Sequence, residues 1–149
     1  MKTVTGIAAA SFILFSTAAA FAGPAEDLLS KWEKLFNDGK TEEIVALYTP
    51  DATLFGTLSP SITTGSEGIK NYFATAAKNK TQVRAPDAPT VTKLSNGALV
   101  LSGIYEFSGT RADGQSFNAP ARYSLVIQDQ AGQWKIVHHH SSPRPKPPQ

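Results

Sequence analysis

Three consecutive histidines near the end of the chain, His138, His139 and His140, have the greatest potential for chemistry in this sequence. They continue a segment that begins at Trp134 and contains the large and β-branched residues typical of a half-buried strand. Because successive side chains of a strand point to opposite faces, His139 and Ser141 are predicted to share one face. The other face is predicted to carry Trp134, Ile136, His138, His140 and Ser142.

Two of these histidines have the spacing of a chelating pair. His138 and His140 could bind a metal ion if an Asp or Glu supplied a third ligand. The sequence offers no third ligand at a suitable spacing, so we assign no metal and no other cofactor. Two interpretations stay open for the pair, namely hydrogen bonding within the sheet and a contact between subunits. His139 and Ser141, on the opposite face, are predicted to line a ligand pocket.

Acid–base catalysis would need a carboxylate or a histidine that is shielded from water, and Glu106 and His139 are the candidates. Glu106 lies in the middle of a predicted strand. If it faces a cavity, burial would raise its pKa and suit it to act as a general base. If it faces outward, it is a solvated charge or part of an interface pair. We assign no catalytic residue, and the sequence contains no nucleophile motif, phosphate-binding loop or dinucleotide fingerprint.

Tyrosines are further candidates for the pocket. The apolar face that carries Tyr123 is expected to meet the helices, which leaves Arg122 on the outer side of the sheet. Tyr48 and Tyr72 are predicted on helices and could place a hydroxyl in a pocket. The predicted ligand pocket therefore consists of Tyr48, Tyr72, Tyr123, His139 and Ser141. The predicted subunit interface consists of Tyr105, Phe107, Arg122, Trp134, His138 and His140.

Helical periodicity predicts three helices in the first half of the chain. They cover residues 25–37, a short segment that Thr41 caps, and a segment from a capping box at Thr64 to about Lys78. Pro50 and Asp51 are predicted to form a turn before a strand at 52–58.

The second half is predicted to contain strands alone, joined by turns such as Asn96-Gly97 and Asp113-Gly114. The predicted strands cover residues 82–85, 90–94, 98–108, 116–129 and 133–142. Helices followed by strands indicate an α+β protein with the helices against one face of an antiparallel sheet. The other face also carries apolar side chains, which favours self-association.

The 149-residue chain is predicted to hold one globular domain at 23–142. Residues 1–22 have one charge, a short apolar stretch and a small-residue pattern that ends at Ala22, which predicts a cleaved secretory signal peptide. The mature protein would be periplasmic or secreted, without stable membrane insertion. Residues 143–149 are predicted to be a Pro-rich disordered tail. With 14 Lys and Arg against 12 Asp and Glu, and no basic block, nucleic-acid binding is not expected.

The run from Gly132 to Ser142, GQWKIVHHHSS, resembles the last strand of the calcium/calmodulin-dependent protein kinase II association domain. Residues 35–39 and 65–73 extend this resemblance, and the chain is identified as a member of the nuclear transport factor 2-like superfamily. The resemblance implies an α+β, cone-shaped fold in which three N-terminal helices pack on a strongly curved antiparallel sheet. It also implies homodimers or higher oligomers. It implies neither kinase activity nor calmodulin binding, because the sequence contains no kinase domain and no calmodulin-binding helix.

In the association domain, arginines help to line a pocket between the sheet and the helices. The corresponding positions here are Glu106, Leu125 and Ser141, so a strongly cationic pocket is not expected. We therefore expect a module that binds a small apolar or weakly polar ligand, or its own copies. Two alternatives stay open. One is an enzyme of the isomerase, dehydratase or cyclase type with Glu106 or His139 as the base, and the other is a structural hub for another exported protein.

Overall fold

The fold is described by a computed structural model that covers residues 23–111 and 113–146. The elements are α1 (Pro24–Asn37), α2 (Thr41–Val45), β1 (Tyr48–Phe55), β2 (Thr63–Thr64), α3 (Gly65–Lys78), β3 (Gln82–Arg84), β4 (Thr90–Lys93), β5 (Leu99–Thr110), β6 (Ser116–Gln130) and β7 (Gln133–Pro143). The predicted signal peptide and residues 147–149 of the predicted tail lie outside the described residues. Within the described ranges, no helix has the length and apolar character needed to cross a membrane.

The helices form where the periodicity predicts them. Helix α1 buries the stripe that contains Leu28, Leu29 and Trp32, and Gly39 follows it with a φ of +66°, which favours glycine. The predicted side-chain caps are wrong. The residue before α2 is Lys40 rather than Thr41, and Thr64 precedes α3 without a side-chain capping hydrogen bond. The helices are therefore held mainly by their buried faces.

The described residues form a mixed sheet of seven strands in the order β2-β1-β7-β6-β5-β3, with β4 paired to β5. The long strands β5, β6 and β7 are antiparallel neighbours, as predicted. The prediction of a wholly antiparallel sheet is wrong, because β1 pairs with β7 in parallel. The first strand of the chain thus lies beside the last, and the sheet carries residues from both halves of the chain.

Strand β1 contains Pro50 and Asp51, which were predicted to form a turn. The register between β1 and β7 shifts between Tyr48 and Thr53, so the ladder is interrupted around the proline. A proline, which has no backbone N–H, is tolerated in a sheet at such an irregularity. The strand therefore begins four residues before the predicted start.

An irregularity in β7 changes which side chains face the helices. Ile127 pairs with Ile136, but the preceding Val126 pairs with His138, so Val137 is an extra residue in the strand. A bulge of this kind reverses the alternation of faces. The prediction that Ile136 shares a face with His138 and His140 is therefore wrong. Ile136, His139 and Ser141 are all buried, whereas His140 is exposed.

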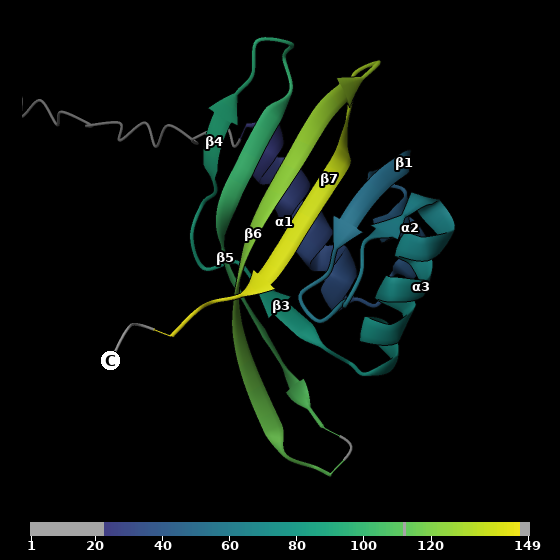
Figure 1. Ribbon diagram of the computed structural model, residues 1–149, viewed down its shortest axis with the longest axis vertical. Helices are drawn as coiled ribbons and strands as arrows, with labels where there is room; N and C mark the ends of the chain where they lie inside the picture. Colours follow the sequence, from purple (N-terminus) through teal and green to yellow (C-terminus); the bar gives the residue numbers. More distant parts are fainter. Residues whose placement is uncertain (1–22, 112, 147–149) are drawn as a thin grey trace, which may run out of the picture.

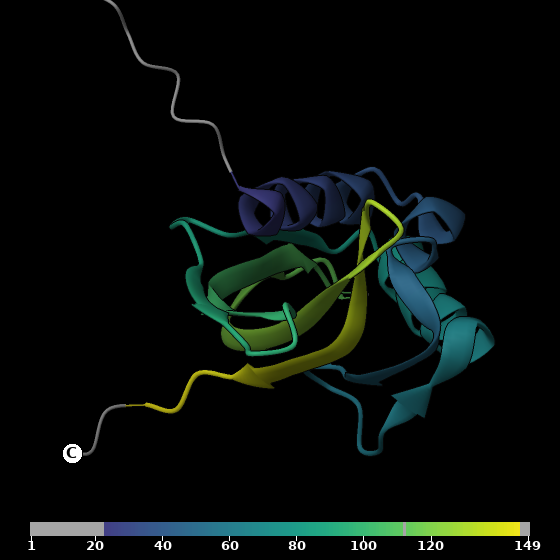
Figure 2. The ribbon, with the colours of Figure 1, turned by 90° about the horizontal axis from the view of Figure 1, so that it is seen from above.

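The sheet curves around its inner face, and the helices lie on this side (Figures 1 and 2). The paired ends of β5 and β6 extend beyond the body of the molecule as an arm (Figure 1). The core between the helices and the sheet contains aromatic residues from both layers, namely Trp32, Phe36 and Phe73 of the helices and Tyr48, Tyr105 and Tyr123 of the sheet. Polar groups that lie behind these aromatic rings are shielded from the surface of the molecule.

Three residues predicted to form a subunit interface belong to this core or pack against it. Tyr105 is only 2% exposed, and Phe107 and Trp134 contact the core cluster. Tyr105 and Phe107 lie on the same inner face of β5 as Leu101, and Trp134 precedes the bulge in β7. Tyr105 is therefore not available to a subunit interface, while the interface prediction for the partly buried Phe107 and Trp134 stays a prediction.

Candidate functional site

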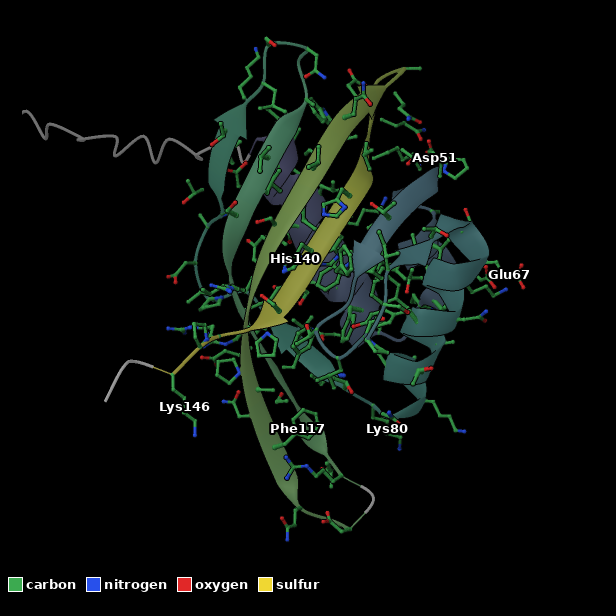
Figure 3. All side chains as sticks on the ribbon, viewed as in Figure 1. Asp51, Glu67, Lys80, Phe117, His140 and Lys146 are labelled. Carbon is green, nitrogen blue, oxygen red and sulfur yellow. The ribbon has the colours of Figure 1, made fainter. Side chains whose placement is uncertain are left out.

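A cavity of about 400 Å³ opens between the inner face of the sheet, helix α3 and the loop that follows β1. Its walls are mostly apolar and include Leu54, Leu58, Pro60, Phe107, Phe117 and Ala119. Its polar groups include Thr57, Tyr72, Tyr105, His139 and Ser141. Phe117 on the arm and Lys80 after α3 lie at the same end of the molecule, where residues 79 and 81 also line the cavity (Figure 3).

The structure places three of the five predicted pocket residues in this cavity, namely Tyr72, His139 and Ser141. Tyr48 and Tyr123 do not line it. Tyr48 is buried behind His139, to which it hydrogen bonds. Tyr123 is buried against Tyr105, with the ring centroids 4.8 Å apart. The assignment of Tyr48 and Tyr123 to the pocket wall is therefore wrong.

A chain of buried hydrogen bonds leads from α1 to the cavity. Trp32 Nε1 donates to the Tyr48 hydroxyl at 3.0 Å, and this hydroxyl lies 2.8 Å from His139 Nδ1. On the other side of the ring, His139 Nε2 lies 3.2 Å from the Tyr105 hydroxyl. Both nitrogens of His139 are thus engaged by tyrosines, which fixes the orientation of the imidazole.

The hydrogens of this chain have one consistent order. An indole N–H can only donate, so the Tyr48 oxygen accepts from Trp32, and Nδ1 of His139 is then the acceptor within reach of the buried Tyr48 hydrogen. A neutral imidazole that accepts at Nδ1 carries its hydrogen on Nε2. His139 then donates to the Tyr105 oxygen, and the hydrogen of Tyr105 takes no part in this chain.

Burial sets the protonation state of these groups. Desolvation lowers the pKa of His139 to about 3, and the neighbouring His138 and His140 act in the same direction. Desolvation also raises the pKa of the Tyr105 and Tyr48 hydroxyls well above the usual range. At neutral pH the imidazole and both phenols are therefore uncharged.

The cavity end of this chain adjoins two further hydroxyls. Thr57 and Ser141 hydrogen bond to each other across the cavity wall. Both also interact with Tyr105 and partly oppose the rise in its pKa. The neighbouring Gly56 lies against Tyr72, and a Cβ at this glycine would overlap the tyrosine ring. The loop after β1 thus brings Thr57 close to Ser141 at the end of β7.

The structure separates Glu106 from the cavity. Its side chain is 37% exposed, and its carboxylate lies 3.9 Å from the Arg84 guanidinium. As a solvated charge in a weak ion pair, it has no access to the cavity. Of the other two positions that correspond to family arginines, Leu125 is buried in the core and Ser141 lines the cavity. The cavity therefore has no cation at these positions.

The remaining polar candidates lie on the outer side of the sheet. His138 Nδ1 is 2.7 Å from the Thr53 hydroxyl, and Arg122 Nε donates to the Ser142 hydroxyl at 3.1 Å. His140 is exposed on β7, on the side turned away from α1 (Figure 3). Among the residues described, no three His, Cys, Asp or Glu side chains come close enough to hold a metal ion.

Sequence reasoning missed two residues that hold His139 in place. Trp32 was read only as part of the apolar stripe of α1, and Tyr105 was assigned to the subunit interface. The alternation along β5 was the available signal for Tyr105, because it places this tyrosine on the face of Leu101. No local pattern could pair Tyr48 with His139, since the two are 91 positions apart.

Comparisons with known proteins agree with this architecture. The family described as "Calcium/calmodulin dependent protein kinase II association domain" matches residues 25–145. A crystal structure from Xanthomonas campestris, provisionally assigned to the same family, is 31% identical with a TM-score of 0.73, covering 80% of this chain and 84% of the other. A search of curated protein sequences finds no match.

Two more distant structures share the fold alone. One is a nuclear transport factor 2-like superfamily protein from Salmonella enterica serovar Typhimurium, 18% identical with a TM-score of 0.70, covering 83% of this chain and 90% of the other. The other is a ketosteroid isomerase-like protein from Erwinia carotovora atroseptica, 17% identical with a TM-score of 0.69, covering 82% of this chain and 95% of the other. The match over residues 25–145 and the 31% identity together show that this chain belongs to the calcium/calmodulin-dependent protein kinase II association domain family, within the nuclear transport factor 2-like fold.

Proposed function

We propose that this chain is an exported, self-associating binding protein that holds a small, mostly apolar molecule between its sheet and helix α3. The single observation that carries the proposal is the cavity of about 400 Å³, with mostly apolar walls and a small number of neutral polar groups. Small-molecule sites have this size and this combination of apolar wall and few polar groups. A structural hub would not need such a cavity, which favours binding over a purely structural role.

Catalysis of the isomerase, dehydratase or cyclase type is the weaker alternative. His139 has a pKa of about 3 because of burial, and both of its nitrogens are occupied by tyrosines. A general base works best with a pKa near the operating pH and with a free lone pair toward the substrate. Glu106 lies outside the cavity, and no Asp or Glu is among the described residues that line it. These points favour binding without proton abstraction.

Self-association is supported by the outer face of the sheet. Val100, Ile104 and Val126 are only half-buried on this face, and Val100 and Val126 pair directly across β5 and β6. Soluble monomers seldom leave a broad apolar surface in water, and a second copy of the chain would cover it. The family description as an association domain points in the same direction. Arg122, His138 and His140 would then belong to the contact, as the sequence predicts.

Export is supported by the signal-peptide pattern of residues 1–22 and by a sequence without cysteine, which needs no reducing compartment. The proposal includes no kinase activity, since the family match covers an association domain alone. The proposal includes homodimers or larger assemblies of this chain, and it does not include calmodulin as a partner.

Native mass spectrometry of the mature protein purified from the periplasm tests the proposal directly. We expect an oligomer that retains a small molecule after gentle ionisation. Ala76→Phe would fill space at the cavity wall on α3, whereas the matched Ala74→Phe changes an exposed position two residues away. Loss of the retained mass in the first variant only supports the proposal. A ligand-free protein that also fails to bind neutral apolar probes would contradict it.

A further inference from the structure

The polar end of the cavity has more donor capacity than its own bonds use. The chain of hydrogen bonds from Trp32 ends with His139 donating to the Tyr105 oxygen, so no bond of this chain uses the hydrogen of Tyr105, whose hydroxyl adjoins those of Thr57 and Ser141. The bond between Thr57 and Ser141 uses one hydrogen of that pair and leaves the other. The cavity thus presents hydroxyl hydrogens from two elements at one place, and both come from uncharged groups.

The direction of the chain matters for this conclusion. If His139 carried its hydrogen on Nδ1, Tyr105 would donate to Nε2 and have no hydrogen left for the cavity. That order would make the Tyr48 oxygen accept from both Trp32 and His139, and it would leave the buried Tyr48 hydrogen without an acceptor, which is costly. A residue on α1 therefore determines the donor character of a hydroxyl on β5.

The remaining wall excludes charged ligands. The described residues that line the cavity include no Lys, Arg, Asp or Glu, so a carboxylate or an ammonium group would lose its hydration without gaining a counter-charge. An uncharged acceptor loses less hydration and can receive the available hydrogen bond. The apolar wall formed by residues such as Leu54, Phe107 and Phe117 suits the rest of such a molecule.

We propose that this cavity selects an uncharged, largely apolar molecule with a carbonyl-type oxygen, which accepts a hydrogen bond from Tyr105 beside Thr57 and Ser141. The inference rests on the proposed binding function and adds the chemical class of the ligand. Tyr105 is the specificity-determining residue, and Trp32, Tyr48 and His139 are positioning residues that act through it.

A matched set of probes tests this assignment in the mature chain. Acetylnaphthalene carries a ketone, ethylnaphthalene replaces the carbonyl with a methylene group, and naphthoate carries a carboxylate. Calorimetric titration should show that the ketone binds about three- to tenfold more tightly than the hydrocarbon, as expected for one hydrogen bond. Naphthoate should bind more weakly than either.

Two variants separate the donor from the packing. Tyr105→Phe keeps the ring and removes the hydroxyl, so it should abolish the preference for the ketone and leave the affinity for ethylnaphthalene within about twofold. Tyr123→Phe is the control, because it removes the hydroxyl of the ring stacked on Tyr105 and does not touch the cavity wall. It should preserve the preference.

Infrared spectroscopy of the bound ketone gives an independent readout on the unmodified protein. A hydrogen bond from Tyr105 should lower the carbonyl stretching frequency below its value in hexane, and a frequency equal to that in hexane would overturn the assignment even if Tyr105→Phe did not fold. Equal affinity for ketone and hydrocarbon, or tightest binding of naphthoate, would also overturn it while the binding function stands. Binding of none of the three probes would overturn both.

Discussion

The Tyr48 hydroxyl lies 2.8 Å from Nδ1 of His139, although the two residues are 91 positions apart in the chain. Tyr48 begins β1 and His139 lies near the end of β7, and these two strands pair in parallel. The contact therefore couples the first strand to the last on the inner face of the sheet. Because Tyr48 also accepts from Trp32, it links α1 to both strands. Its removal should affect stability and the imidazole together.

Tyr48→Phe should lower the free energy of unfolding by about 1–3 kcal/mol, because it leaves Trp32 Nε1 and His139 Nδ1 buried without a partner. Urea unfolding followed by tryptophan fluorescence measures this change. In the wild-type protein, ¹⁵N NMR should find the hydrogen of His139 on Nε2. Tyr123→Phe is the control, because the hydroxyl of Tyr123 is buried with no hydrogen-bond partner among the described residues. A loss no larger than that of the control would contradict the role given to Tyr48.

Acid should destabilise the protein through His139. Its pKa is about 3 in the folded state, against 6.5 for an unperturbed histidine, because burial disfavours the charged ring. The unfolded state then binds the extra proton as the pH falls below 6.5, so stability declines from there toward the folded pKa. The slope should approach about 1.4 kcal/mol per pH unit, and the interval from pH 6.5 to about 4.5 avoids most carboxylate titration.

His139→Gln tests the assignment of this slope, because an amide can donate and accept but does not titrate. Unfolding curves at several pH values should show a much flatter dependence for this variant. A smaller dependence of stability on pH, with the same sign, should remain from His138. Its pKa is also lowered, mainly by burial and to a lesser degree by the charge of His140. An unchanged slope in His139→Gln would assign the acid sensitivity to other groups.

The run of histidines illustrates what the sequence could and could not predict. Alternation correctly separates His139 and Ser141 from His138 and His140, because all four lie after the bulge in β7. It fails for Ile136, which lies before the bulge. An extra residue such as Val137 reverses the faces without any local signal that distinguishes it from its neighbours. Alternation therefore predicts which face of the sheet a side chain takes only within a stretch of strand that contains no such bulge.

The polar end of the cavity could be predicted only in part, for a different reason. His139 and Ser141 were recognised from the alternation of faces along a strand, and Tyr72 because it is a tyrosine on the apolar side of its predicted element. Tyr48 and Tyr123 match the same description, but the tertiary packing buries them one layer deeper. Their depth depends on neighbours far away in the chain, such as Trp32 and Tyr105, which local periodicity does not reveal.

Gly103 should be needed for the tyrosine stack that supports Tyr105. A Cβ at this position would lie 2.5 Å from the Tyr123 hydroxyl and 2.7 Å from the carbon that bears it. The Tyr123 ring is stacked on Tyr105 and has little freedom to move. Gly103→Ala should therefore lower the free energy of unfolding by about 1–3 kcal/mol. Thermal and urea unfolding measure it.

A second variant separates this steric effect from the general cost of replacing a glycine. Tyr123→Phe removes the closest atom but leaves the ring carbon, so the double variant with Gly103→Ala should recover part of the loss. Gly114→Ala is unsuitable as a control because Gly114 has a φ of +84°. Gly103 has no such restriction, and its requirement is the contact alone. Additive losses in the double variant would show that the contact with Tyr123 is not the cause.

Ile104→Glu should disrupt the proposed oligomer. Ile104 lies on the outer face of β5, where it pairs with Arg122 of β6, and it is one of the half-buried apolar residues of this face. Burial of a carboxylate between two copies carries a large desolvation cost, and the pairing with one Arg122 offsets only part of it. We expect at least about a tenfold increase in the dissociation constant, measured by size-exclusion chromatography with light scattering. Ala74→Glu adds the same charge on the exposed side of α3 and should leave the mass unchanged. A wild-type chain that is monomeric at micromolar concentration would contradict the proposed self-association, whereas an oligomer unaffected by Ile104→Glu would move the contact to another surface.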